Sequence, residues 1–255
     1  MKIGSSTLYS LFSKRPVESA RELSSYGINT MELVYEYPHI YPRKEVRELS
    51  SLGYDYSVHC PFVALCFVHQ NPSIRKLNKK LITRSLEAAE MLGATHYVMH
   101  GGLAPYSYQM VDKTKTRKYF LDLFMREFKD AFSKADKKGI KILVENMNKG
   151  QLFDNPADIT YIREKMPFIG FCYDIGHGEI LGQREGLLAL KPDYVHVSDN
   201  NLKVDSHLPI GWGCIDFDSV FRSLRKTRFD GKVILECSSL KDTFKSYRKL
   251  LTLLP

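Results

Sequence analysis

Four acidic or imidazole side chains end short apolar runs of this sequence. Glu145 ends K-I-L-V-E, Asp174 ends I-G-F-C-Y-D, Glu236 ends K-V-I-L-E, and His196 lies near the end of D-Y-V-H-V-S. A charge buried there without a partner would cost several kcal/mol. Mixed histidine and carboxylate ligands suit Zn²⁺, Mn²⁺, Fe²⁺ or Co²⁺, whereas Mg²⁺ prefers oxygen ligands alone. The four residues therefore predict a site for a divalent transition metal.

Other histidines lie at the ends of the same kind of run or just after one. They are His39, His59, His100, His177 and His207. Any single histidine of this kind is more often a satisfied polar group than a metal ligand. His69 and His96 fit no ligand position, and we expect His96 to face a helix. Glu32 lies within an apolar run, where it points into the interior or pairs with a basic neighbour.

The elements that must position these side chains alternate along the whole chain. Eight apolar runs of strand length are spaced by longer amphipathic stretches such as 75–92 and 117–138. The runs span 2–5, 29–35, 54–59, 96–100, 141–145, 169–174, 193–198 and 232–236. Four glycines that precede strands have the position of helix-ending residues: Gly27, Gly53, Gly93 and Gly139.

Eight strand-helix units of ~30 residues favour a (β/α)8 TIM barrel in the α/β class, formed as a single domain by residues 1–255. A doubly wound open sheet is the alternative, but no G-x-G-x-x-G follows the first strand. In a barrel, the carboxyl ends of all strands meet on the face that carries active sites. The acids and histidines above should therefore converge there.

The composition is that of an ordinary globular protein. The 255 residues include 37 Lys+Arg and 29 Asp+Glu, which gives a net charge of +8. No stretch reaches the ~18–20 apolar residues that span a bilayer, and the first residues lack the apolar core of a signal peptide. Five cysteines without a C-x-x-C pair suggest reduced thiols. We therefore expect a cytoplasmic protein without a membrane segment, whose positive charge raises the question of an acidic partner.

Seven segments in order along the chain resemble the xylose isomerase-like barrel superfamily, which includes sugar isomerases and epimerases and the endonuclease IV group. The segments are S-V-H-C-P-F (57–62), V-M-H-G-G (98–102), V-E-N-M (144–147), G-F-C-Y-D-I-G-H (170–177), H-V-S-D-N (196–200), D-S-H-L-P-I-G-W-G-C-I-D-F (205–217) and L-E-C (235–237). The resemblance implies that Glu145, Asp174, His196 and Glu236 hold a shared metal. His177 would bind the substrate or a second metal.

The sugar branch implies a metal-dependent isomerase or epimerase. Glu145 or Glu236 would remove a proton beside the carbonyl and the other would return it, through a metal-stabilised enediolate. His177 would hydrogen-bond a substrate oxygen. Phe62 and Trp212 would line the pocket, and the apolar loop 62–67 is either a lid or a loop packed against helices. The substrate would be a small sugar or sugar phosphate.

The endonuclease IV branch is the alternative, with up to three zinc ions at an abasic site in DNA. It would add a metal at His59, His100 and Glu145 and another at His177, Asp205 and His207. A nuclease needs basic loops around its site. Loop 60–73 has no Lys or Arg, although the loop after strand four does contribute Lys113, Lys115 and Arg117. The H-V-S-D-N and 205–217 segments also favour the sugar branch. A non-catalytic metal-binding scaffold is a third reading, and the oligomeric state is left open between a monomer and a homo-oligomer.

Overall fold

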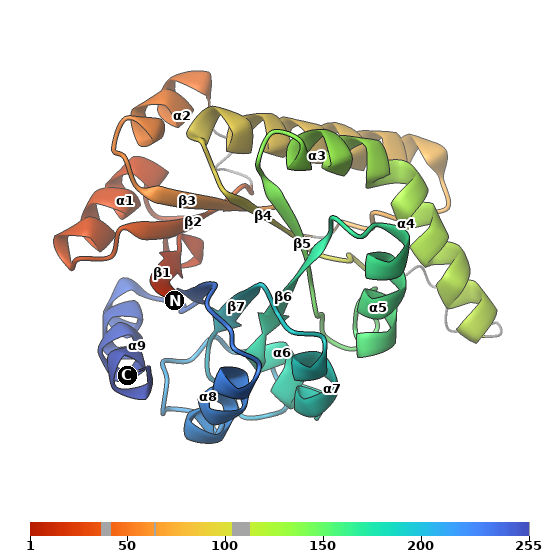
Figure 1. Cartoon of the computed structure of the whole chain (residues 1–255). Helices are drawn as coiled ribbons and strands as arrows, with labels where there is room; N and C mark the ends of the chain where they lie inside the picture. The colour runs from red at the N-terminus through yellow and green to blue at the C-terminus, as the bar shows by residue number, and fades with distance from the viewer. Residues whose placement is uncertain (37–41, 64, 104–112, 255) are drawn as a thin grey trace.

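The computed structural model describes residues 1–36, 42–63, 65–103 and 113–254, so His39 lies outside the described residues. Within them, eight parallel strands close into a barrel in chain order, and β1 pairs with both β2 and β8 (Figure 1). The strands are β1 (Lys2–Ser6), β2 (Thr30–Val34), β3 (Asp55–His59), β4 (His96–Met99), β5 (Lys141–Glu145), β6 (Gly170–Asp174), β7 (Tyr194–Val197) and β8 (Lys232–Leu235). The TIM barrel predicted from the alternating runs is confirmed.

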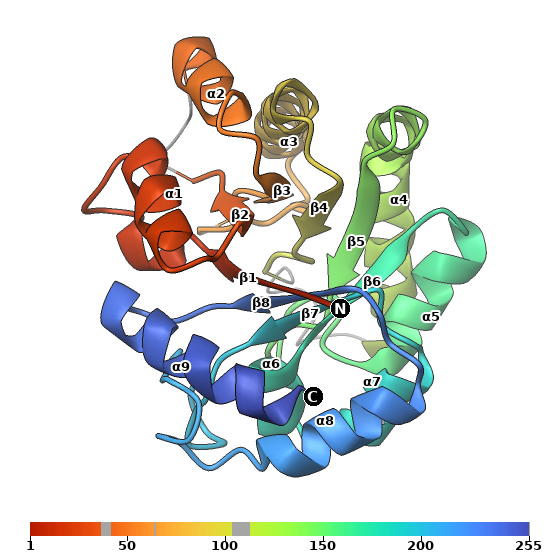
Figure 2. The ribbon, with the colours of Figure 1, turned by 60° about the vertical axis from the view of Figure 1, so that its left-hand side comes forward.

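Helices surround the strands on the outside, and the first and last helices lie side by side where the barrel closes (Figures 1 and 2). In the described residues they are α1 (Pro16–Ser25), α2 (Arg43–Ser50), α3 (Pro72–Leu92), α4 (Lys113–Asp136), α5 (Pro156–Lys165), α6 (Ile175–Ile180), α7 (Arg184–Ala189), α8 (Phe217–Lys226) and α9 (Leu240–Leu253), with one 3₁₀ turn at Leu8–Ser10.

Local sequence signals set the ends of helix α3. The Asn71 side chain accepts a hydrogen bond from the Ser73 N–H at 2.9 Å, and Pro72 occupies the first turn, where its missing N–H has no cost. The helix ends at Gly93, whose φ of 70° lies in the left-handed region that glycine adopts without strain.

Basic residues such as Lys76 and Lys80 lie on the exposed face of α3. Much of the positive charge noted in the sequence therefore lies outside the barrel.

Apolar residues form two layers, one between strands and helices and one inside the barrel. The outer layer includes a row of phenylalanines on α4, Phe124, Phe128 and Phe132, all fully buried. The inner layer consists of Val98, Leu143, Cys172, Tyr194 and Ile234. Because side chains alternate along a strand, residues two positions further on point into the barrel as well, nearer its carboxyl-terminal mouth.

A charged cluster closes the opposite end of the barrel. Asp55 starts β3 and accepts hydrogen bonds from Lys232 Nζ at 2.5 Å and Lys2 Nζ at 2.7 Å. The Lys232 ammonium also donates to Thr95 Oγ1 at 2.8 Å. His96 lies nearby, with its ring 5.4 Å from that of Tyr194, so it faces the barrel interior and not a helix. The cluster joins β1, β3 and β8 at the end remote from the candidate site.

Replacing Asp55 by asparagine should lower the free energy of unfolding by about 2 kcal/mol, because it leaves the buried Lys232 ammonium without its anion. Burial would raise the pKa of Asp55, but the hydrogen bonds from Lys2 and Lys232 outweigh it and lower that pKa. The carboxylate therefore stabilises the fold above pH about 4, and this contribution is lost as the pH falls through the lowered value.

Urea unfolding of wild type and Asp55→Asn at pH 7 and at pH 3 measures this contribution. The two proteins should differ at pH 7 and converge toward pH 3. The control is Lys2→Met, because the Lys2 side chain is 67% exposed and its ion pair contributes little. Equal unfolding midpoints for wild type and Asp55→Asn at pH 7 would contradict the expectation.

Candidate active site

The strand alternation carries the site residues to the barrel mouth. His100, Glu145, Asp174, His196 and Glu236 each come two residues after a member of the inner apolar layer. Their side chains therefore form the next layer toward the carboxyl ends of the strands, where TIM barrels have their active sites. The convergence expected from the sequence is present in the structure.

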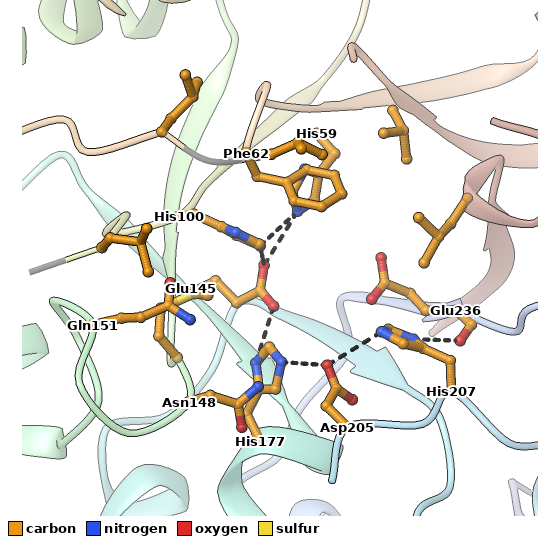
Figure 3. A pocket seen from close by; sticks show the side chains of 16 residues that line it. His59, Phe62, His100, Glu145, Asn148, Gln151, His177, Asp205, His207 and Glu236 are labelled. Carbon is orange, nitrogen blue, oxygen red and sulfur yellow. Dashed lines mark hydrogen bonds and ion pairs between the residues drawn. The ribbon is translucent and has the colours of Figure 1, made fainter. Parts of the chain in front are cut away.

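A cavity of about 490 Å³ opens at this mouth, within the range of about 300–1,000 Å³ typical of small-molecule sites (Figure 3). Its polar lining consists of His59, His100, Glu145, Asn148, Gln151, His177, Asp205, His207 and Glu236. Its apolar lining consists of Leu8, Val34, Phe62, Val63, Leu65, Leu103 and Met147. His59, Glu145, His177 and Glu236 are buried, with Glu145 only 1% exposed, whereas the other polar lining residues are half-buried.

Glu145 lies at the centre of the site, between four imidazoles. Its Oε2 lies 3.2 Å from His100 Nε2 and 3.5 Å from His59 Nε2. Its Oε1 lies 3.4 Å from His196 Nδ1 and 3.5 Å from His177 Nδ1. Figure 3 shows the carboxylate between His100 on one side and His177 on the other. One carboxylate thus contacts side chains from four other strands or the segments that follow them.

A second chain of contacts runs from His177 toward Glu236. Asp205 Oδ2 lies 3.0 Å from His177 Nε2 and 3.2 Å from His207 Nε2, and so bridges the two imidazoles. His207 Nδ1 in turn bonds the main-chain oxygen of Glu236 at 2.8 Å. His207 has a φ of 46°, in the left-handed region that non-glycine residues rarely adopt. The segment after β7 therefore holds this imidazole over the cavity at some cost in backbone strain.

Glu32 reaches the site from one layer deeper in the barrel. It is fully buried, and its carboxylate lies 3.1 Å from His196 Nε2 and accepts the Tyr194 hydroxyl at 2.8 Å. The sequence leaves two alternatives for Glu32: it points into the interior, or it pairs with a basic neighbour. In the structure Glu32 does both. With Nε2 bonded to Glu32, the His196 Nδ1 faces Glu145 and Glu236.

The donor set fits a divalent cation. Among the described residues, eight buried side-chain atoms have no hydrogen-bond partner, and five of them belong to residues of this site: Glu32 Oε1, Glu145 Oε2, Asp174 Oδ2, His196 Nδ1 and Asp205 Oδ1. Those of Glu145, Asp174 and His196 belong to the quartet that the sequence predicts as metal ligands, and buried polar atoms are rarely left unpaired in proteins. Among the described residues, candidate metal-holding groups also include His59–His100–Glu145, Glu32–His196–Glu236 and Glu145–Asp174–His177. The buried carboxylates and imidazoles suit a transition metal more than an oxygen-only ion.

The sequence predicts Glu145 and Glu236 as a proton-transfer pair. Their surroundings shift the pKa values of the two carboxyl groups in opposite directions. Burial would raise the pKa of Glu145, but His100 and His196 outweigh it and hold that pKa well below its usual value. Burial raises the pKa of Glu236 to about 7, against the lowering effect of His196. Glu145 is thus the ionised carboxylate, while Glu236 is the one that more readily takes a proton.

Two histidines on the cavity wall also differ in charge. Burial lowers the pKa of His100 to about 4, so this imidazole is neutral near pH 7. Burial would lower the pKa of His207 too, but its hydrogen bond to Asp205 raises that pKa to about 9. The cavity wall therefore carries a neutral imidazole at His100 and a positively charged imidazole at His207.

Trp212 does not reach the cavity, which corrects the expectation that it lines the pocket. Its side chain is 65% exposed, and Lys245 Nζ lies 4.0 Å from the centre of its ring. Asp199 accepts hydrogen bonds from the N–H groups of Gly211 and Gly213 at 2.9 Å. These bonds hold the main chain on both sides of Trp212 against the buried Asp199. The indole is thereby turned toward α9 and solvent.

The segment after β3 both lines the cavity and packs into the core. Phe62, Val63 and Leu65 lie on the cavity wall, whereas Phe67 is fully buried against Phe128. Residue 64 lies outside the described residues. The packing of Phe67 against Phe128 agrees with a loop packed on helices, and the alternative of a lid stays a prediction.

The basic residues that the sequence places after strand four lie at the start of a helix and not in a loop. Lys113, Lys115 and Arg117 belong to the first turns of α4. Arg117 lies 2.6 Å from Asp154 and also pairs with Asp158 in α5, so its guanidinium is held between helices.

Comparison with known proteins agrees with this geometry. Residues 20–254 match the family described as xylose isomerase-like TIM barrel. The protein MJ1311 of Methanocaldococcus jannaschii is 28% identical over 96% of this chain and 87% of its own length. The solved structure of a D-tagatose 3-epimerase-like protein has a TM-score of 0.88 and 28% identity, and covers 100% of this chain and 97% of that one. The TTHB071 protein of Thermus thermophilus, soaked with ZnCl2, shares the fold at a TM-score of 0.82 and 22% identity, with 100% and 98% covered.

Proposed function

The chain belongs to the xylose isomerase-like TIM barrel family, and we propose that it is a divalent-metal-dependent isomerase or epimerase of a small sugar. The observation that carries the proposal is the set of unpartnered buried ligand atoms on Glu145, Asp174 and His196 at the base of a monosaccharide-sized cavity. The likeness to a protein named D-tagatose 3-epimerase-like supports the same class of reaction.

Glu145, Asp174, His196 and Glu236 would hold the cation. When bound, it would polarise the substrate carbonyl and acidify the neighbouring C–H. Glu145, whose pKa is held well below its usual value, is suited to remove that proton, and Glu236 is suited to return one. Because the two glutamates come from β5 and the end of β8, they can reach the substrate carbon from different sides, as epimerisation requires.

The remaining polar groups would orient the sugar. His177 is held by Asp205 at 3.0 Å, so its ring has a fixed direction from which to hydrogen-bond a substrate oxygen. His59 and His100 border the same cavity, 3.0 Å apart, opposite His177 across Glu145. These groups would bind hydroxyls at the deep end of the cavity, while the apolar wall excludes water from the reacting carbons.

The endonuclease IV-like alternative remains a second candidate, because one further observation favours it. His59, His100, His177, Asp205 and His207 all border the cavity, as two additional zinc ions would require. The apolar wall and the internal pairing of Arg117 speak against a surface that grips DNA.

Removing divalent cations should abolish sugar interconversion, because the cation supplies the carbonyl polarisation that no described cavity residue replaces. We expect protein treated with EDTA and desalted to lose all detectable exchange of solvent deuterium into D-tagatose or D-fructose, measured by proton NMR. Mn²⁺, Co²⁺ or Zn²⁺ should restore it better than Mg²⁺. The same preparations are incubated with a duplex that contains an abasic site.

Two outcomes would contradict the proposed function. One is full deuterium exchange by protein that elemental analysis shows to be free of metal. The other is metal-dependent cleavage of the abasic duplex, lost in His207→Ala, with no exchange into any ketose.

A further inference from the structure

One side of the outer cavity wall, formed by Val63, Leu65 and Leu103, is apolar. Val63 and Leu103 are about half exposed, at 50% and 52%, which places them at the rim, whereas Glu145 is 1% exposed at the base. Leu65 lies beside Leu103, whose N–H donates to the Leu65 main-chain oxygen at 3.1 Å. A sugar bound with its carbonyl end at the carboxylates would therefore place its other end among apolar side chains.

Lysine and arginine are absent from the described residues that line this cavity. The segments outside the described residues, 37–41, 64 and 104–112, also contain no Lys or Arg in their sequence. The basic residues that precede α1 pair with acids on the helices, Lys14 with Glu22 and Arg15 with Glu48. A phosphate group on the substrate would thus meet three lining carboxylates and no ammonium or guanidinium group.

Several main-chain donors in the described residues near the mouth, the other means of binding a phosphate, are occupied by the protein's own carboxylates. TIM barrels frequently bind phosphate through the loops after strands seven and eight. Here the loop after β7 wraps around the buried Asp199. Its Oδ2 accepts the N–H groups of Gly211 and Gly213, and its Oδ1 accepts that of Ile215 at 3.2 Å.

Two further carboxylates fill donors near the mouth in the same way. Glu36 Oε2 accepts the N–H groups of Phe62 at 2.8 Å and Val63 at 2.9 Å. Asp174 Oδ1 accepts the His177 N–H at 2.6 Å, at the start of α6. These main-chain donors, of the kind that recognise phosphate in other proteins, are therefore satisfied internally.

Building on the proposed function, we infer that the substrate is an unphosphorylated keto-sugar whose end remote from Glu145 is apolar, as in a deoxy-sugar. The deep end of the cavity supplies the polar groups for the reacting carbons. Among the described rim residues, Val63, Leu65 and Leu103 supply apolar contacts and Gln151 a neutral amide, so a phosphate there would be desolvated without a Lys or Arg partner.

The test compares D-fructose, 6-deoxy-D-fructose and D-fructose 6-phosphate as matched substrates of the metal-loaded protein. The kcat/KM for deuterium exchange at the carbon next to the carbonyl is measured by proton NMR. We expect the 6-deoxy sugar to equal or exceed D-fructose and to exceed the 6-phosphate by about 100-fold or more.

A rim variant provides the matched control. Leu103→Lys adds an ammonium at the exposed rim, and Leu103→Ser removes the apolar contact without adding charge. Both should lower kcat/KM for the 6-deoxy sugar, and only Leu103→Lys should raise it for the 6-phosphate, by about tenfold.

The outcomes separate this inference from the proposed function. A wild-type kcat/KM for the 6-phosphate equal to or above that for D-fructose overturns the inference and leaves the isomerase or epimerase in place. Exchange into none of the three sugars, together with cleavage of an abasic duplex, overturns the proposed function itself.

Discussion

Glu145→Gln is expected to lower the kcat of sugar interconversion by about 10³-fold, within the range for loss of a positioned general base. The amide keeps the size of the side chain but cannot take the proton from carbon. It also replaces a negative charge that faces four imidazoles within 3.5 Å. Steady-state rates at saturating metal measure the effect, and the bound metal is quantified in the same samples.

The matched control for this variant is Glu164→Gln, which makes the same change on the exposed side of α5. It should leave both kcat and metal content at the wild-type level. Circular dichroism melts establish that Glu145→Gln is folded. A folded, metal-saturated Glu145→Gln protein with a kcat within a few-fold of wild type would show that another group removes the proton.

Glu32→Gln is expected to weaken metal binding by about 10- to 100-fold, although Glu32 is not one of the proposed ligands. The carboxylate lies 3.1 Å from His196 Nε2 and thereby directs Nδ1 toward Glu145 and Glu236. An amide can donate to that nitrogen as well as accept from it, so the orientation of the imidazole proton is no longer fixed. Isothermal titration with Mn²⁺ or Co²⁺ measures the dissociation constant.

Tyr194→Phe is the matched control, because it removes the other hydrogen bond to Glu32 and retains the carboxylate. It should weaken metal binding much less than Glu32→Gln. The ¹⁵N chemical shifts of His196 provide a readout independent of activity, since they distinguish the two neutral tautomers. Unchanged shifts and an unchanged dissociation constant in Glu32→Gln would show that Glu32 has a packing role only.

The barrel and most of its mouth could be predicted from the sequence because they depend on local patterns. A buried parallel strand needs a short run of apolar residues, and β5 (Lys141–Glu145) coincides with its predicted run. The polar residue that ends such a run is carried to the carboxyl end of its strand by the alternation of side chains. Glu145 and Asp174 could therefore be assigned to one face before any contact was known.

Contacts between distant segments could not be read in the same way. Glu32 and His196 lie 164 positions apart, and only the closed barrel brings their side chains within 3.1 Å. A glutamate inside an apolar run was the one signal available, and it did not specify a partner. The direction of the Trp212 side chain depends on the hydrogen bonds between Asp199 and the main chain around Trp212. Such a loop has no periodic sequence pattern from which its geometry could be predicted.

The two halves of the chain contribute differently to the cavity. The proposed cation ligands all come from β5 to β8 and the residues that follow them, whereas the apolar lining, apart from Met147, comes from residues 8–103. Amino-acid changes that reshape the rim can therefore accumulate in the first half without disturbing the cation ligands in the second. This division would let descendants of one ancestral barrel exchange one sugar for another while they inherit the same reaction.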